Sequence, residues 1–294
     1  IQAAFCAAVA DAPTILKAAS SEQHLAQIVS RQFEESGAPL RGLAEARYWR
    51  GGDLDAESVA LSSIDNMIVF GEDATIEQIR GRAAHVRFTG YGESYSIGYV
   101  HADAEVGQAA AASAEDVCLF DQRGCMSPQT IYVAGDTGKA LLFTRTLAEQ
   151  IRAKADQLPR AAFEPGEGAQ VADSVRRLGL TAVAPLPHGL DTLVKGPLRE
   201  GAPEFAVALE PFGQPTCAGF GRIVVVKHAP NARDVATQLK HFGRQVETIG
   251  LASQTPERDR SAFVLSGARR LCMLGEMQRP PFGYRPAPRD FQAA

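Results

Sequence analysis

The residues best suited to chemistry lie in the stretch FDQRGCMSPQ, residues 120–129. Cys125 follows a glycine there, Gln122 and Ser127 are close by, and the apolar run TIYV comes directly after. A thiolate is a strong nucleophile toward thioesters, and its attack forms a second thioester, so the bond energy is conserved. The residues alone leave two interpretations open. Cys125 is either a nucleophile presented on a loop or a buried structural thiol, because cysteine is among the most buried residue types.

The other cysteines and the histidines form no cluster in the sequence. Cys6, Cys118, Cys217 and Cys272 make no CxxC pair, and the six histidines have no metal-ligand spacing. We therefore predict that the chain has no metal site and that these four cysteines are structural. Free cysteines in odd number are typical of a reducing compartment, and the predicted location is the cytoplasm.

Composition sets broad limits on the function. The chain has 294 residues, of which 45% are hydrophobic and 22% charged, as in globular proteins with room for two domains. Its net charge of −4 gives no electrostatic reason to expect a nucleic-acid partner. No apolar run approaches the length of a membrane span, so none is expected.

Strand-like and helix-like runs alternate along the chain, which predicts an α/β fold with a parallel sheet and helices on both of its faces. PTILK, NMIVF, SIGYV and TIYVAG are predicted as strands, with amphipathic helices between them. We predict three parts: a cofactor-binding domain (residues 1–100), a catalytic domain (101–270) and a Pro-rich tail outside both cores (271–294). The Pro-rich stretch 279–288 is expected to be extended.

Five motifs, taken in order, resemble the fatty acyl-CoA reductases of bacterial bioluminescence operons, which belong to the aldehyde dehydrogenase superfamily. They are TILKAAS, FGEDAT, FTGYGESYSIGYV, QRGCMSPQ and LCMLGEMQRPPFGYR. The resemblance covers most of the chain, and the loop around Cys125 and the segment MQRPP are its most specific parts. It implies an aldehyde dehydrogenase-like fold with two Rossmann-like three-layer α/β/α domains and a cleft between them. It also implies that an N-terminal part is missing before Ile1.

The resemblance implies an NADPH-dependent reductase. An acyl thioester, either acyl-CoA or an acyl-carrier thioester, would be reduced to an aldehyde through a covalent acyl-Cys125 intermediate. The Cys125 amide is a candidate oxyanion donor, and Gln122 would orient the loop. Two alternatives stay open, a cysteine acyltransferase or thioesterase without a redox step and an inactive truncated paralogue. Relatives in the superfamily assemble, so a homo-oligomer of the full-length protein is expected.

The resemblance places cofactor contacts in the first half of the chain. Lys17, at the end of PTILK, matches the lysine that lies on the adenosine ribose. Ser20 stands where NAD-preferring relatives carry a carboxylate, and a small neutral side chain there leaves room for a 2′-phosphate, which favours NADPH. Glu22 would argue against this preference if its side chain pointed toward the ribose.

Further candidates for cofactor binding come from turns and from one acidic residue. Gly52, after ARYWR, and Gly71 with Thr75, after NMIVF, resemble the superfamily's glycine turns under the pyrophosphate and nicotinamide. Ordinary tight turns are the alternative. Glu210, in the run EPFG, resembles the glutamate that holds the nicotinamide ribose.

The predicted general base is Glu93. It is the carboxylate within GYGES, near the position where aldehyde-oxidising relatives carry their catalytic glutamate. Glu93 would deprotonate Cys125 or a water molecule. An exposed loop glutamate without a catalytic role is the alternative.

Overall fold

The computed structural model describes residues 2–20, 22–181, 193–243, 245–281 and 284. It divides into two compact units, with the boundary between Tyr91 and Gly92. The sequence placed this boundary near residue 100. It lies earlier because strand β5 (Tyr95–Val100) hydrogen-bonds to two strands of the second unit.

The first unit consists of two β-α-β arrangements. Strand β1 (Thr14–Lys17) pairs in parallel with β2 (Ala44–Arg47), and β3 (Asn66–Phe70) pairs in parallel with β4 (Arg87–Tyr91). Within the described residues these are two separate two-stranded sheets rather than one Rossmann sheet. The helices of this unit are α1 (Gln2–Val9), α2 (His24–Glu35), α3 (Leu54–Leu61) and α4 (Asp73–Arg82).

The second unit is built on a seven-stranded sheet in the order β13-β12-β5-β6-β11-β10-β7. All neighbours pair in parallel except β7 and β10, which are antiparallel. The remaining strands of this sheet are β6 (Pro128–Ala134), β7 (Leu193–Lys195), β10 (Ala206–Glu210), β11 (Ile223–Ala229), β12 (Val246–Ala252) and β13 (Arg270–Met273). A short hairpin joins β8 (Leu198–Arg199) to β9 (Ala202–Pro203).

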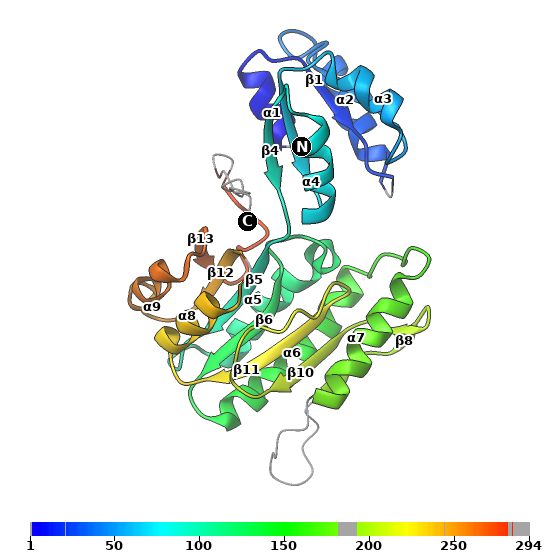
Figure 1. The fold of residues 1–294 in the computed structure, drawn as a ribbon. Coiled ribbons are helices and arrows are strands. Elements are labelled where there is room, and N and C mark those ends of the chain that lie inside the picture. Colours follow the sequence, from blue (N-terminus) through cyan, green and yellow to red (C-terminus); the bar gives the residue numbers. More distant parts are fainter. Residues whose placement is uncertain (1, 21, 182–192, 244, 282–283, 285–294) are drawn as a thin grey trace. The chain divides into compact units, whose positions relative to one another are not determined.

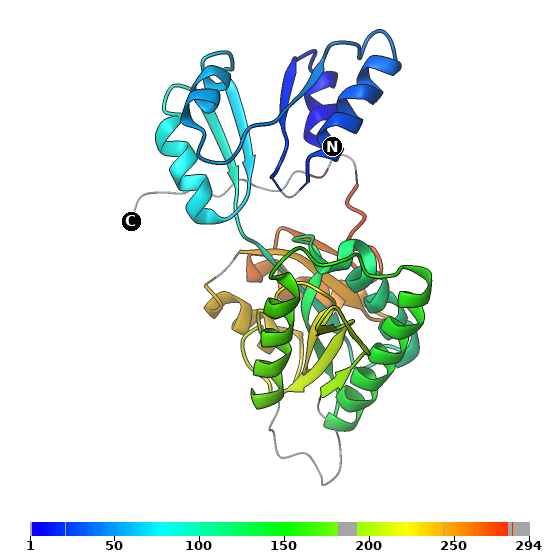
Figure 2. The ribbon, with the colours of Figure 1, turned by 90° about the vertical axis from the view of Figure 1, so that its right-hand side faces the viewer.

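Helices cover both faces of this sheet, as the alternating pattern predicts (Figures 1 and 2). Ile131 and Val133 of β6 pack in the core beneath the helices on one face, while Tyr132 and Ala134 pack on the opposite face. This alternation is the period-2 pattern of a strand that is buried on both sides. The first face carries α5 (Val106–Cys118) and α6 (Thr137–Gln157); the second carries α7 (Glu167–Thr181), α8 (Ala232–His241) and α9 (Pro256–Phe263). The 3₁₀ helices are η1 (Leu119–Gln122) and η2 (Val264–Ser266).

The beginning of the expected tail is part of the folded sheet. Arg270–Met273 forms β13 and pairs with β12, and Met277 is 0% exposed. The sequence prediction of a tail from residue 271 therefore differs from the structure here, because Leu274 and Met277 are core residues. Of the Pro-rich stretch, residues 282–283 and 285–294 lie outside the described residues.

Candidate active site

Cys125 lies in a tight turn directly before β6. The Ser127 N–H donates to the Gly124 carbonyl oxygen at 3.0 Å, so Cys125 occupies a corner of the turn. The residue as a whole is exposed, although protein atoms surround part of its thiol. Because β5, β6, β11 and β12 run in parallel, their amino ends share one edge of the sheet, and the Cys125 turn lies at this amino edge.

The backbone just before the turn is left-handed at three successive residues. The φ angles are 57° at Phe120, 51° at Asp121 and 61° at Gln122. Such angles are unfavourable for residues other than glycine, at about 1–2 kcal/mol each. Strain of this kind persists only where surrounding contacts fix the backbone, and it is frequent at functional sites.

Gln122 supplies one set of those contacts. Its Nε2 donates to the carbonyl oxygens of Pro128 at 2.9 Å and Ile223 at 2.7 Å, and its Oε1 accepts from the Ile223 N–H at 2.7 Å. The side chain is buried, and these bonds fasten the loop to the amino ends of β6 and β11. The role that the geometry gives Gln122 is orientation of the loop, through backbone groups.

Asp121 supplies the second set. Its carboxylate forms an ion pair with Arg222 at 2.6 Å and also accepts the Ala161 N–H at 2.9 Å. Arg222 is 2% exposed, so the pair is largely withdrawn from water. Removing either partner of such a buried pair leaves an uncompensated charge, which is strongly destabilising.

Two serines contact Cys125, Ser96 on strand β5 and Ser94 just before that strand. Ser96 donates its hydroxyl to the Cys125 carbonyl oxygen at 2.7 Å and accepts the Thr248 N–H at 3.1 Å. Ser94 hydrogen-bonds to the Cys125 thiol. The turn is therefore tied to β5 and β12 through side chains that the local sequence around Cys125 does not contain.

The surroundings raise the pKa of the Cys125 thiol. The main cause is desolvation by the protein atoms around the thiol, and the second is the negative charge of Glu247. The hydrogen bond from Ser94, the Cys125 N–H and the positive charge of Arg269 act in the opposite direction. At neutral pH the thiol of the free protein is therefore protonated, and nucleophilic attack needs a group that accepts its proton.

Glu247 is a site residue that the sequence analysis missed. It is the second residue of β12 and is 2% exposed. One carboxylate oxygen lies 3.2 Å from Arg269 Nη1, and the other accepts the Tyr284 hydroxyl at 2.7 Å. The run VETIGLAS indicates only a strand, so its position at the amino edge becomes visible only from the sheet order.

Glu93, the predicted general base, is exposed in the segment between β4 and β5. Its chain neighbour Ser94 carries the hydrogen bond to the Cys125 thiol. The backbone thus brings Glu93 into the neighbourhood of Cys125, and its role as base stays a prediction.

Lys17 and Ser20 lie at and beyond the carboxyl end of β1, both exposed. The Lys17 ammonium lies 5.8 Å from the centre of the Trp49 ring. Glu22 points elsewhere: its carboxylate accepts the N–H groups of His24 and Leu25 at 2.9 Å and caps the start of α2. Because its carboxylate is engaged at the start of α2, Glu22 argues less strongly against binding of a ribose 2′-phosphate near Lys17 and Ser20.

The predicted glycine turns lie between strands and the helices that follow them in the first unit. Gly52 has φ +87°, with open space where a Cβ would be, just before α3. Gly71 follows β3 and donates its N–H to the Tyr91 carbonyl at 3.3 Å. Thr75 is exposed in the first turn of α4, which also holds Asp73. An acid in the first turn opposes anion binding at this helix start.

Glu210 is in the second unit, at the carboxyl end of β10, and is 8% exposed. Its Oε2 lies 2.9 Å from the Lys227 ammonium and accepts the Thr216 hydroxyl at 2.7 Å. These contacts give Glu210 a place in the core of the second unit, and a contact with the cofactor stays a prediction.

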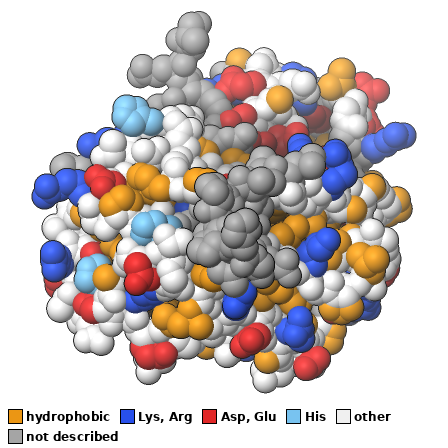
Figure 3. Space-filling model, turned by 90° about the horizontal axis from the view of Figure 1, so that it is seen from below, with side chains coloured by type: hydrophobic (Ala, Val, Ile, Leu, Met, Phe, Trp, Pro, Cys, Tyr) orange, Lys and Arg blue, Asp and Glu red, His pale blue; other side chains and the backbone are white. Residues whose placement is uncertain are grey.

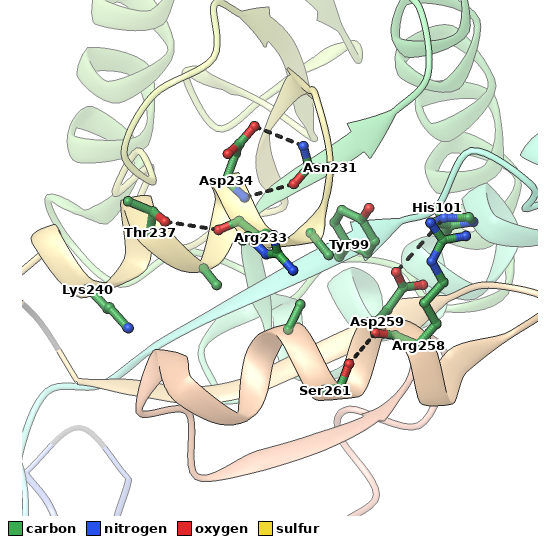
Figure 4. A pocket seen from close by; sticks show the side chains of 13 residues that line it. Tyr99, His101, Asn231, Arg233, Asp234, Thr237, Lys240, Arg258, Asp259 and Ser261 are labelled. Carbon is green, nitrogen blue, oxygen red and sulfur yellow. Dashed lines mark hydrogen bonds and ion pairs between the residues drawn. The ribbon is translucent and has the colours of Figure 1, made fainter.

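A separate cavity of about 780 Å³ lies between α8 and α9 (Figure 4). Tyr99 forms its centre, with Lys240 at one end and His101, Arg258 and Asp259 at the other. It runs along the two helices, and His101 and Asn231, at the end away from Lys240, lie just after the carboxyl ends of β5 and β11. None of the residues predicted from the sequence lines it.

Two kinds of feature are absent from the described residues. Within them no group of three or more His, Cys, Asp or Glu side chains is arranged to hold a metal ion. No helix in the described part of the chain has the length and apolar character needed to cross a membrane. On the face drawn in Figure 3, basic, acidic and apolar side chains are intermixed.

The family model described as acyl-CoA reductase (LuxC) matches residues 3–285. The chain belongs to this acyl-CoA reductase family. It is 29% identical over 150 residues to long-chain acyl-protein thioester reductase 2 of Photobacterium leiognathi. This alignment covers 50% of this chain and 31% of that protein. It is 25% identical over 266 residues to the long-chain acyl-protein thioester reductase of Photorhabdus laumondii, in an alignment that covers 89% of this chain and 52% of that protein. The chain thus spans at most about half the length of these relatives.

Solved structures confirm the fold of this member of the acyl-CoA reductase family. The aldehyde dehydrogenase KauB from Pseudomonas aeruginosa superposes with a TM-score of 0.73 at 16% identity, covering 89% of this chain and 54% of that one. The NAD-dependent benzaldehyde dehydrogenase from Corynebacterium glutamicum gives a TM-score of 0.68 at 18% identity, covering 88% and 57%. The predicted aldehyde dehydrogenase-like fold is therefore confirmed.

Proposed function

We propose that this protein reduces an acyl thioester to an aldehyde, with NADPH as reductant and Cys125 as the covalent nucleophile. The observation that carries the proposal is the Cys125 turn. An exposed cysteine follows a strained segment that Gln122 and Asp121 hold in place, and Ser94 contacts its thiol. Relatives named as long-chain acyl-protein thioester reductases support a long-chain acyl group carried on a protein, and the family description as acyl-CoA reductase supports CoA as the carrier.

The reaction follows from the residues around Cys125. A base, for which Glu93 is the candidate, accepts the thiol proton. The thiolate then attacks the acyl carbonyl carbon, a C–S bond to Cys125 forms, and the donor thiolate leaves and is protonated. The Cys125 N–H interacts with its own sulfur and is the candidate donor to the carbonyl oxygen of a bound acyl group.

A bound NADPH would supply a hydride to the acyl carbon. As the aldehyde forms, the C–S bond to Cys125 breaks and the thiolate returns. The residues at the end of β1 fit a phosphorylated ribose: Lys17 offers a positive charge, Ser20 is neutral, and Glu22 is engaged in capping α2. Gly52, Gly71, Thr75 and Glu210 remain further candidate contacts. A homo-oligomeric full-length protein in the cytoplasm stays part of the same prediction.

Intact-mass analysis after incubation with a long-chain acyl-CoA tests the proposal. We expect an acyl adduct on the wild-type chain that NADPH discharges as aldehyde, and no adduct on the Cys125→Ala variant. Cys6→Ala, which removes another exposed cysteine, is the matched control and keeps the adduct. An adduct that turns over without oxidation of NADPH would favour the acyltransferase or thioesterase alternative. An adduct that persists on Cys125→Ala would end the assignment of the nucleophile.

A further inference from the structure

Two glycines on neighbouring strands form a hollow in the central sheet. Gly98 of β5 and Gly250 of β12 are aligned partners. A Cβ added to Gly250 would lie 2.5 Å from the sulfur of Met277 and 2.8 Å from Leu274, so the hollow exists only without side chains there. Leu274 and Met277 fill it and are 7% and 0% exposed. The segment 274–279, called here the C-terminal segment, is therefore packed into the core.

Asp116 fixes the backbone of the C-terminal segment. It lies on α5, is 0% exposed, and accepts the N–H groups of Gly275 at 2.6 Å and Met277 at 2.9 Å. A buried carboxylate that accepts two backbone N–H groups holds the segment in one position, because either group left unsatisfied would be costly. Gln278, directly after Met277, is thereby placed beside the turn that carries Cys125.

The Gln278 amide contacts both ends of that turn. Its Nε2 donates to the Ser127 hydroxyl and lies 3.4 Å from the Asp116 carbonyl oxygen. Its Oε1 is so close to Gly124 that a Cβ added there would lie 3.0 Å away. Gly124 and Ser127 are the residues whose backbone hydrogen bond closes the turn around Cys125. The absence of a side chain at Gly124 thus makes room for Gln278.

Arg270 links the C-terminal segment to the remaining corner of the turn. Its Nη1 donates to the Met277 carbonyl at 2.6 Å, and its Nη2 donates to the Glu276 carbonyl at 2.7 Å. Nη1 also lies 3.8 Å from the sulfur of Met126, the residue after Cys125. The segment and the turn are therefore joined by two independent side chains.

We infer that the C-terminal segment positions the nucleophile, with Gln278 as the positioning residue that acts on Cys125 through Ser127 and Gly124. The effect of this positioning on the rate of acyl reduction rests on the proposed function. The motif LCMLGEMQRPPFGYR thereby gains a role: its Leu274 and Met277 anchor it, and its Gln278 braces the turn. Gln278 is not assigned a contact with the substrate.

The test compares Gln278→Ala and Ser127→Ala, singly and together. The first measurement is the pH midpoint of Cys125 alkylation by iodoacetamide. Looser geometry weakens the hydrogen bonds from Ser94 and the Cys125 amide that lower the thiol pKa. We therefore expect the midpoint to rise in each single variant. Better access alone would change the plateau rate and leave the midpoint unchanged.

The second measurement is steady-state reduction of a long-chain acyl-CoA. We expect kcat to fall about three- to tenfold in Gln278→Ala with KM nearly unchanged, as for one lost hydrogen bond that orients a reacting group. The double variant should be little worse than either single variant, because the two side chains act through one contact. Gln254→Ala is the matched control: Gln254 also donates to a backbone carbonyl, that of Asp103, beyond the opposite end of β12.

An unchanged midpoint in Gln278→Ala, or effects of the two single variants that simply add, would overturn the inference. A loss of activity that only follows the loss of folded protein would do the same. If the wild-type protein neither takes up acyl groups nor oxidises NADPH, the proposed function fails, and the alkylation midpoints still decide whether Gln278 positions Cys125.

Discussion

At the scale of single residues, the protonation of Cys125 is the central property of the site. Desolvation and Glu247 both raise the thiol pKa, and only weaker contacts oppose them. A thiol that stays protonated in the free protein is protected from oxidation and unspecific alkylation, both of which proceed through the thiolate. The proposed attack by Cys125 therefore requires a base that removes the thiol proton.

Replacing Glu247 with glutamine tests this electrostatic argument. The change removes the negative charge while Arg269 remains, so the pKa of Cys125 moves down toward its ordinary value. Alkylation of Cys125 by iodoacetamide at about pH 8 should become several-fold faster, since each pKa unit is worth about tenfold in thiolate. Glu257→Gln on α9 removes an exposed carboxylate and serves as control. A rate that stays the same or falls in Glu247→Gln would contradict the assigned influence of this carboxylate.

How far the site could be predicted depends on where each residue lies in the chain. Cys125 and Gln122 occur in one short motif, so the sequence alone brought them together. Glu247 and Gln278 reach the same turn from β12 and from beyond β13. Their proximity depends on the strand order of the sheet, which local patterns do not specify. The pairing of Gly98 with Gly250 is invisible in the sequence for the same reason.

At the scale of elements, the left-handed segment before Cys125 stores backbone strain. Phe120 is 67% exposed and has φ 57°, so its side chain gives little packing in return for an unfavourable backbone. Glycine adopts this conformation without a Cβ penalty. Phe120→Gly should therefore unfold at higher denaturant concentration than Phe120→Ala, with a difference of about 1 kcal/mol in the free energy of unfolding.

The alanine variant serves as the reference because it removes the same ring and keeps the strain. Urea unfolding of both variants, followed by labelling of the buried Cys118 thiol, measures the second unit directly. If Phe120→Gly were no more stable than Phe120→Ala, the segment would not be strained in solution. Asp121 is unsuitable for this test, since its replacement also removes the ion pair with Arg222.

The sequence predicted which segments form helices or strands better than it predicted which strands pair with one another. The alternating runs predicted most helices and strands because periods of 2 and 3.6 follow from backbone geometry. The strand β13 was missed, and residues from 271 onward were assigned to a tail, since a four-residue strand beside a Pro-rich stretch has no clear period. The two separate sheets of the first unit were also unexpected, because pairing between β-α-β arrangements is a tertiary property.

At the scale of the whole molecule, stability should depend on pH through Asp116. Burial raises the pKa of its carboxyl from 3.8 to about 7, although the N–H groups of Gly275, Met277 and Gln278 act to lower it. The folded state therefore binds more protons than the unfolded chain between these two values. The stabilisation that this group contributes is fully present below pH 3.8, its unfolded-state pKa, and is lost as the pH rises through its folded-state pKa of about 7.

Asp116→Asn, which does not titrate, isolates this contribution. The stability of the wild-type protein relative to the variant should fall on the order of 2 kcal/mol between about pH 5.5 and about pH 8. Trp49 is the chain's single tryptophan and belongs to the first unit, so its fluorescence does not report on Asp116. Labelling of Cys118 as a function of urea concentration does report on Asp116, because both residues lie on α5. Asp136→Asn, at the exposed start of α6, controls for general charge effects. A relative stability that is constant across this range would mean that Asp116 is ionised throughout, and that its backbone hydrogen bonds outweigh its burial.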